Sequence, residues 1–181
     1  MVWELQFMEW GKEWWSSPFL DQVIPWVTHL VSLPAALLFI LVACTVLRRK
    51  KVILLLLFLY GIVAGSVYGL KYFILRPRPF QVLGMASQLY QTRGEVFDPS
   101  FPSAHATYAF MMATLLAFWF PRYRILFYVL AGFIGWTRIY LFLHYPSDVI
   151  AGCLLGYGIT RLSNLWRGGL EGTSPRPNNE I

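Results

Sequence analysis

Long apolar runs separated by short polar clusters dominate this chain. A helix that crosses the hydrocarbon core of a bilayer needs about 20 predominantly apolar residues. Because lipid offers no hydrogen-bond partner to an exposed backbone, runs of this kind are expected to be α-helices. The pattern predicts five spans, at residues 24–47, 52–70, 103–120, 125–143 and 148–166. The basic connection 48–51 is so short that the first two spans should form a helical hairpin.

The stretch 1–17 is too short to span a bilayer but has an amphipathic pattern. Aromatic residues recur at helical spacing along one of its sides, namely Trp3, Phe7, Trp10 and Trp14. This predicts an interfacial helix on the outer surface, which we interpret as an orientation anchor. The stretch 167–181, rich in Gly, Pro and Asn, is predicted to be a flexible tail. The expected fold is therefore all-α, a polytopic transmembrane helical bundle in a single membrane-embedded domain, 1–166.

Composition supports the membrane interpretation. Hydrophobic residues make up 57% of the chain and charged residues 13%, whereas soluble domains carry about 25% charged residues. This excludes an ordinary soluble domain, a disordered chain and a coiled coil. The net charge of +6 does not indicate nucleic-acid binding, because the basic residues lie between the apolar runs.

The distribution of charge predicts the orientation of the bundle. One face of the predicted topology receives nine basic and two acidic residues, and the other receives six basic and seven acidic residues. The positive-inside rule assigns the first face to the cytoplasm. The amino terminus, the loop 76–102 and the turn around His144 should then face the periplasm or the exterior of the cytoplasmic (inner) membrane.

Two stripes of small residues occur at helical spacing. Gly61, Gly65 and Gly69 lie in the second predicted span, and Gly152 and Gly156 lie in the fifth. Small residues let helix backbones approach closely. We expect both stripes to serve packing within the molecule.

Titratable residues gather at the outward ends of the spans, where burial is costly. A charge in the middle of a bilayer costs about 2.5–3.5 kcal/mol on insertion scales, so such residues usually have a function. Three separate stretches of chain contribute them: Lys71 and Arg78, then His105, then Arg138, His144 and Asp148. Taken alone, each stretch also fits snorkelling cations, an interfacial histidine or a structural His–Asp pair.

Taken together, these residues fit a binding site for a tetrahedral anion. Ser103 follows a proline and should begin a helix, whose first N–H groups attract anions. His105, on the first turn, has the chemistry of a general acid. Asp148 lies four positions after His144, so its carboxylate is expected to orient that imidazole for attack. Because the cations supply the positive charge, no metal or other cofactor is expected.

The three stretches resemble the motifs of the type 2 phosphatidic acid phosphatase superfamily of membrane lipid phosphatases. Lys71 to Arg78-Pro79 matches the first motif fully. Pro102-Ser103-Ala104-His105 matches the second with Ala in place of Gly, and Thr137-Arg138 through His144 to Asp148 matches the third with Thr in place of Ser. Three motifs in the right order and spacing make the resemblance specific.

The resemblance implies a role for each matching residue. His144 would attack phosphorus to form a phosphohistidine, Asp148 would orient it, and His105 would protonate the leaving oxygen and later activate water. Five residues would hold the phosphate: Lys71, Arg78, Ser103, Ala104 and Arg138.

The expected substrate is a phosphorylated lipid of the surrounding bilayer. Undecaprenyl diphosphate is favoured, with lipid A 1-phosphate, phosphatidylglycerol phosphate and phosphatidate as further candidates. The loop 81–100 is either a cover for the headgroup or a plain connector. One alternative function is a phosphotransferase that passes the phosphoryl group from the same histidine to another lipid. Another is a non-catalytic protein that binds or flips lipid headgroups.

Overall fold

The computed structural model describes residues 2–27, 50–84 and 98–171, and every regular element within them is helical. The elements are α1 (Val2–Trp15), α2 (Pro18–Val27), α4 (Lys50–Ile74), α5 (Pro79–Val82), α7 (Ala104–Trp119), the short 3₁₀ helix η2 (Pro121–Tyr123), α8 (Arg124–Tyr140) and α9 (Pro146–Glu171). The predicted all-α class is confirmed. Most of the predicted span 24–47 lies outside the described residues.

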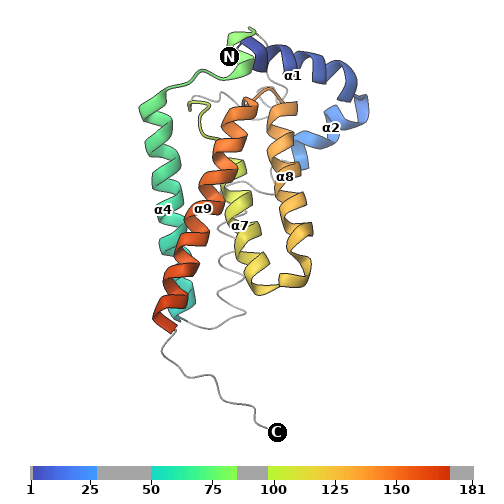
Figure 1. Ribbon diagram of the computed structural model, residues 1–181. Coiled ribbons are helices and arrows are strands. Elements are labelled where there is room, and N and C mark those ends of the chain that lie inside the picture. Colours follow the sequence, from blue (N-terminus) through green and yellow to red (C-terminus); the bar gives the residue numbers. More distant parts are fainter. Residues whose placement is uncertain (1, 28–49, 85–97, 172–181) are drawn as a thin grey trace.

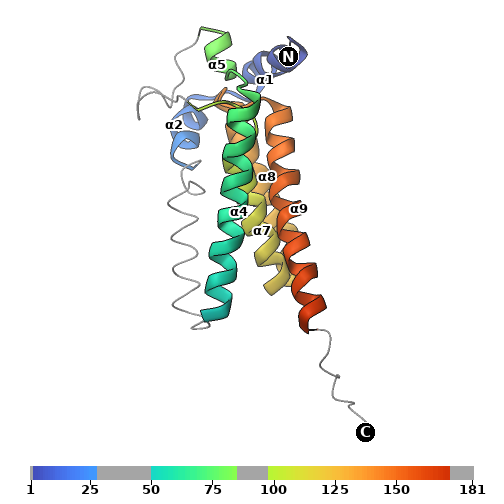
Figure 2. The same ribbon diagram turned by 90° about the vertical axis from the view of Figure 1, so that its left-hand side faces the viewer.

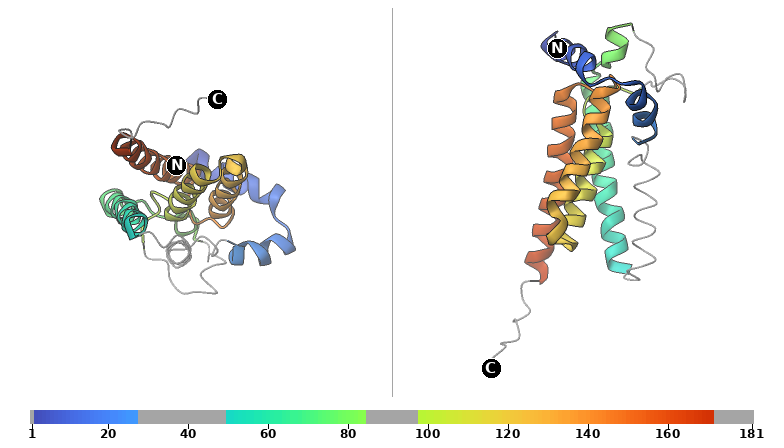
Figure 3. Two further views of the ribbon diagram at one scale, coloured as in Figure 1. Left: turned by 90° about the horizontal axis from the view of Figure 1, so that it is seen from below. Right: turned by 90° about the vertical axis from the view of Figure 1, so that its right-hand side faces the viewer.

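Four long helices run side by side and form the body of the molecule (Figure 1). Helix α7 lies between α8 and α9 and packs against both, while α4 packs against α9 and α7 (Figure 3). The short helices α1, α2 and α5 all lie at one end of this bundle (Figure 2). That end, called the capped end below, therefore has an additional layer of chain formed by α1, α2 and α5.

The helix ends at this capped end follow from local sequence. Helix α4 continues through Lys71 to Ile74, and Leu75 then adopts a left-handed φ of 52°. Pro77 and Pro79 follow, and proline prevents the helix from continuing. Helix α9 begins at Pro146, a residue whose fixed φ suits the first helical turn, and it extends to Glu171, beyond the predicted end of the fifth span.

Close packing between α7 and α9 depends on two glycines. A Cβ atom on Gly156 would lie 2.1 Å from the Thr107 carbonyl oxygen, and one on Gly152 would lie 2.6 Å from that of Ser103. This stripe therefore packs within the molecule, as expected. A Cβ on Gly61, Gly65 or Gly69 would meet none of the described residues within 4 Å.

The outward faces of the bundle are apolar. Among the described residues, one stretch, Leu56–Val82, which contains most of α4 and the short α5, is long and apolar enough to cross a membrane by length and composition, and Ala104–Trp119 is a shorter apolar helix. Large side chains on α4, α8 and α9 face away from the core, among them Leu54, Phe58, Ile62, Leu126, Val129, Phe133, Ile150 and Leu154. Large exposed apolar side chains in this number are typical of helices in contact with lipid.

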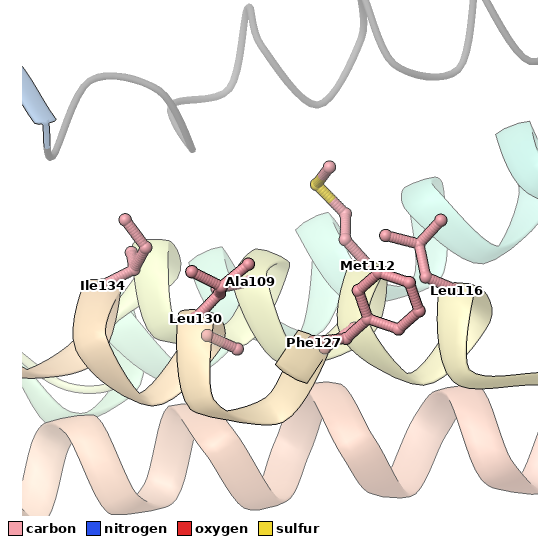
Figure 4. Close-up of a pocket in the computed structure, with 8 residues that line it drawn as sticks. Ala109, Met112, Leu116, Phe127, Leu130 and Ile134 are labelled. Atoms are coloured by element: carbon pink, nitrogen blue, oxygen red, sulfur yellow. The ribbon is translucent and has the colours of Figure 1, made fainter. Parts of the chain in front are cut away.

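A hollow of about 120 Å³ lies between α7 and α8 (Figure 4). Its walls are apolar side chains, including Met112, Leu116, Phe127 and Ile134. None of the described residues that line this hollow is titratable, so they do not offer the groups that acid–base or nucleophilic chemistry needs. Those groups lie instead at the capped end of the bundle.

Candidate active site

Titratable side chains from two of the three predicted stretches of chain converge in a buried cluster at the capped end. None of them is more than 4% exposed: Lys71, Arg78, Arg138, His144 and Asp148. Burying several charges costs free energy unless they are paired and hydrogen-bonded. Contacts between the stretches provide that pairing.

A tight turn after α8 fixes the backbone of His144. The Arg138 carbonyl oxygen accepts hydrogen bonds from the N–H groups of Leu143, at 3.1 Å, and of His144, at 3.3 Å. The intervening Phe142 has a left-handed φ of 54°. Strained backbone of this kind is concentrated at functional sites, where the surrounding structure must hold it.

The two ring nitrogens of His144 have different partners. Nδ1 lies 2.7 Å from the backbone carbonyl oxygen of Ser100, and Nε2 lies 3.4 Å from Nη1 of Arg78. Since a carbonyl oxygen only accepts, Nδ1 must carry the proton. Nε2 then has a lone pair, and this lone pair faces Nη1 of Arg78.

Asp148 acts on His144 largely through Ser100. The Asp148 Oδ2 atom is 3.8 Å from Nδ1 of His144, which is too long for a hydrogen bond. The Ser100 hydroxyl donates to that oxygen at 2.5 Å and lies 3.4 Å from Nδ1. Sequence reasoning expected a direct His–Asp contact and missed Ser100, whose functional contact is partly a backbone carbonyl and so has no sequence signature.

Lys71 and Arg78 are bridged by the carboxylate of Asp98. The Asp98 oxygens lie 2.9 Å from Nζ of Lys71 and 2.7 Å from Nη2 of Arg78. Lys71 also donates to the Pro99 carbonyl, and Arg78 donates to the carbonyls of Asp98 and Leu143. An anionic group of the protein thus lies against two of the cations that were predicted to hold phosphate.

The charge of Asp98 is secured by these neighbours. Burial acts to raise the pKa of this carboxyl, but Arg78 and Lys71 outweigh burial and hold the pKa below its ordinary value. Asp98 is therefore ionised at neutral pH. Its side chain is 36% exposed, so it forms the solvent-facing edge of the cluster.

Ser103 caps helix α7, as the sequence predicted. Its side chain accepts a hydrogen bond from the Ala106 N–H at 3.5 Å, and its own N–H donates to the Asp148 carbonyl at 3.0 Å. The second contact fixes the start of α7 against the start of α9. Ala104 and His105 follow on the first turn and are half-buried. The helix N-terminus therefore lies next to the segment that contains Asp148.

Two further charged residues reach the cluster from outside the predicted motifs. Arg76 donates to Asp148 Oδ1 at 2.5 Å and to Glu4 Oε2 at 2.7 Å. Glu4 lies on α1 and is 3% exposed. The amphipathic pattern of α1 comes from its aromatic side chains. It therefore gives no indication that the Glu4 carboxylate is buried. Nothing in the sequence signals this contact.

The protonation state of His144 follows from its surroundings, and it can be measured directly. Burial, together with the positive charges of Arg78, Arg138 and Lys71, lowers the pKa of His144 well below its ordinary value. We expect its ring ¹⁵N shifts to remain those of a neutral imidazole when the pH falls below about 6.5, the pKa of an unperturbed histidine. The chain has three histidines, and His144→Ala assigns the signal. Protonation at or above pH 6.5 would contradict this prediction.

Comparison with known proteins identifies relatives over part of the chain. A lipid A 1-phosphatase from Rhizobium johnstonii is 43% identical over 81 residues, which are 45% of this chain and 33% of that protein. An undecaprenyl-diphosphatase from Sulfolobus acidocaldarius is 36% identical over 107 residues, 59% of this chain and 50% of that protein. The matches thus span about a third to a half of the length of these relatives.

A third relative belongs to a different class of enzyme. The catalytic subunit aur1 of the inositol phosphorylceramide synthase of Schizosaccharomyces pombe is 41% identical over 56 residues. These residues are 31% of this chain and 13% of that protein.

Solved structures and a family model cover more of the chain. The fold is similar to a transmembrane PAP2-type phosphatidylglycerolphosphate phosphatase from Bacillus subtilis, with a TM-score of 0.73, 24% identity, and coverage of 98% of this chain and 88% of that one. It is also similar to LpxE from Aquifex aeolicus, with a TM-score of 0.74, 24% identity, and coverage of 89% and 94%. The model of the PAP2 superfamily matches residues 52–170. This match confirms the resemblance seen in the motifs, and the chain belongs to the PAP2 superfamily.

Proposed function

We propose that this chain is a membrane lipid phosphatase that hydrolyses a phosphomonoester or diphosphate of an envelope lipid. The observation that carries the proposal is the unprotonated Nε2 atom of His144, which lies 3.4 Å from Nη1 of Arg78 in a buried cationic cluster. Membership of the PAP2 superfamily and the lipid phosphatases among its relatives support the same reaction.

In the first chemical step, Nε2 of His144 attacks the phosphorus atom of the substrate. The N–P bond forms as the bond to the lipid oxygen breaks, and His105 gives its proton to that oxygen. Nδ1–H keeps its hydrogen bond to the Ser100 carbonyl, so the positive charge that develops on the imidazole is partly balanced by Asp148, 3.8 Å away. Dividing one difficult displacement into two easier steps is the benefit of covalent catalysis.

In the second step, water hydrolyses the phosphohistidine. His105 has lost its proton in the first step and now accepts one from the attacking water, whose oxygen forms a bond to phosphorus as the N–P bond breaks. Inorganic phosphate leaves, and His144 is again neutral. The residues proposed to hold the phosphate oxygens in both steps are Lys71, Arg78, Ser103, Arg138 and the backbone of Ala104.

The buried cations provide a test of metal independence. Lys71, Arg78 and Arg138 supply positive charge at the place where phosphate charge develops, and preorganised donors of this kind stabilise the transition state strongly. We expect phosphate release to be unchanged by EDTA and to be inhibited by vanadate, which mimics five-coordinate phosphorus. Loss of activity in EDTA, with recovery on adding Mg²⁺, would overturn this account.

The proposed site faces the outer headgroup layer of the cytoplasmic membrane. Exposed arginines lie at the opposite end of the bundle, including Arg122, Arg124 and Arg161, and the positive-inside rule assigns that end to the cytoplasm. We also retain the predicted five-span topology as part of this proposal. Labelling of single cysteines introduced at Arg122 and at Ser147 by a membrane-impermeant reagent in intact cells tests the orientation.

A panel of phosphorylated lipids tests the function itself. The purified protein is assayed for phosphate release from undecaprenyl diphosphate, lipid A 1-phosphate, phosphatidylglycerol phosphate and phosphatidate in the same detergent. We propose the first two as the leading substrates, because relatives acting on them match this chain. Turnover of at least one lipid supports the proposal, whereas no release from any of them contradicts it.

Phosphoryl transfer to a second lipid is the competing proposal. The similarity to an inositol phosphorylceramide synthase favours it, because a synthase passes a phosphorylated group to an acceptor other than water. The same phosphohistidine would then be attacked by a lipid hydroxyl. Stoichiometric phosphate release from a single purified lipid supports the phosphatase, and release that depends on an added acceptor supports the transferase.

The position of Asp98 leads to a prediction about anion affinity. Its carboxylate bridges Lys71 and Arg78, so an incoming phosphate must displace it. Because the Asp98 side chain is partly exposed, its attraction to Lys71 and Arg78 is screened by solvent. We expect Asp98→Asn to tighten vanadate binding by roughly three- to tenfold, equivalent to about 1 kcal/mol.

The control for this prediction is Glu9→Gln, which removes an exposed carboxylate from α1 and should leave vanadate affinity unchanged. Weaker vanadate binding by Asp98→Asn would mean that Asp98 organises the two cations instead of competing for them.

A further inference from the structure

Glu4 is a buried carboxylate on a helix that also carries several exposed aromatic side chains. It is 3% exposed, whereas Trp3 is 63% and Trp10 is 54% exposed. Both of its oxygens have partners in the active-site region: Oε1 accepts from the Ser147 N–H at 3.0 Å, and Oε2 accepts from Arg76 at 2.7 Å. Helix α1 lies across the end of the bundle where these segments meet (Figures 1 and 2).

Arg76 connects Glu4 to the catalytic carboxylate. Its Nη2 binds Glu4, while its Nη1 donates to Asp148 Oδ1 at 2.5 Å and to the Ser147 hydroxyl at 2.7 Å. The guanidinium group also stacks on Tyr145, with 3.9 Å between its central carbon and the ring centroid. Because a guanidinium group is planar and rigid, fixing one of its ends fixes the direction of the other.

The two carboxylate oxygens of Asp148 therefore bind different partners. Oδ1 is bound by Arg76, and Oδ2 accepts from the Ser100 hydroxyl at 2.5 Å and from the Tyr145 N–H at 2.9 Å. Oδ2 is also the oxygen nearest to Nδ1 of His144. Since Asp148 is fully buried, removing Arg76 would leave Oδ1 without this charged donor, and the carboxylate could rotate away from Ser100.

We propose that Arg76 and Glu4 are positioning residues through which helix α1 orients Asp148, and through Asp148 the nucleophile His144. This inference rests on the proposed function and extends it to the amino-terminal helix. Arg76 and Glu4 do not touch the reacting atoms. The phosphate-binding cations, Lys71 and Arg78, are held by other contacts. The positioning pair should therefore affect the chemical step and not substrate binding.

The test separates the chemical step from binding and from folding. We expect Arg76→Gln to lower kcat by about 10- to 100-fold and Glu4→Gln by about 3- to 10-fold, with less than about a twofold change in KM or vanadate affinity, the pattern for a loss confined to the transition state. Arg76→Lys keeps the positive charge but lacks the planar guanidinium group that binds two partners at once. It should therefore recover part of the kcat that Arg76→Gln loses. Rates are expressed per vanadate-binding site, so that unfolded protein is not counted. Glu9→Gln, exposed on the same helix, is the matched control.

A double-mutant cycle distinguishes positioning from a merely structural connection. If Arg76 acts through Asp148, then Arg76→Gln should cause no further loss of phosphohistidine formation in single turnover once Asp148→Asn is present. Additive losses, or an unchanged kcat in both Arg76→Gln and Glu4→Gln, would overturn the inference. If Arg76→Gln does not fold, Glu4→Gln is combined with Asp148→Asn in the same cycle. Failure of the wild-type protein to hydrolyse any lipid would instead refute the proposed function.

Discussion

The His144→Ala variant is expected to release no phosphate from any lipid and to carry no acid-labile phosphate. The loss should be about 10⁴-fold or more, as for removal of the nucleophile in other covalent hydrolases. The reason is geometric: Nδ1 is bound by the Ser100 carbonyl, and Nε2 is the ring nitrogen directed towards Arg78. No side chain among the described residues can replace it at the same position with the same lone pair. Phosphate release and labelling from a ³²P-labelled lipid measure the two effects.

The matched control for this prediction is His105→Ala. His105 lies on the first turn of α7 and is half-buried, outside the turn that holds His144. As the proposed general acid, its loss should slow turnover by about 10²- to 10⁴-fold. Labelled protein should still form, because the nucleophile is intact. Labelling of His144→Ala, or near-normal phosphate release without His144, would contradict the assignment of His144 as the nucleophile.

The residues that the sequence predicted well are those whose burial is expensive. Lys71, Arg138 and His144 occur at the ends of apolar runs, where an unpaired charge or polar group would destabilise the fold. Because alternate ends of consecutive spans meet at one membrane face, the pattern also predicted that these residues converge. The structure brings them into one cluster in which none is more than 4% exposed. For these positions, the free-energy cost of burial and the predicted topology were sufficient to predict that the residues lie together.

Ser100, Arg76 and Glu4 could not be predicted in the same way. The Ser100 contact with His144 uses a backbone carbonyl, which every residue type possesses. An arginine two positions before Arg78 resembles an ordinary snorkelling cation at a helix end. Glu4 lies far from the motifs along the chain. The role of each depends on which segments the folded chain brings into contact, and periodicity does not contain this information.

Helix ends were predicted well where the sequence contains a residue that ends or caps a helix. The prolines after α4 and the serine before α7 define those ends closely. The apolar pattern marks the part of a helix that lipid can surround, and it says little about where the helix stops in water. This explains why α9 continues to Glu171 although the apolar run of the fifth span ends at Trp166.

Arg78→Lys should lower kcat/KM by about 10²- to 10³-fold although it preserves the charge, because a preorganised multidentate donor is lost. Nη1 of Arg78 reaches both the Leu143 carbonyl and the neighbourhood of His144 Nε2, while Nε and Nη2 bind Asp98. A lysine ammonium is a single point charge and cannot hold this arrangement, so both phosphate binding and alignment of the nucleophile should suffer. Arg122→Lys, at an exposed position at the other end of the bundle, is the matched control and should leave kcat/KM unchanged. Equal activity in the two variants would show that charge alone is sufficient at Arg78, and the geometric basis of the proposed site would then be wrong.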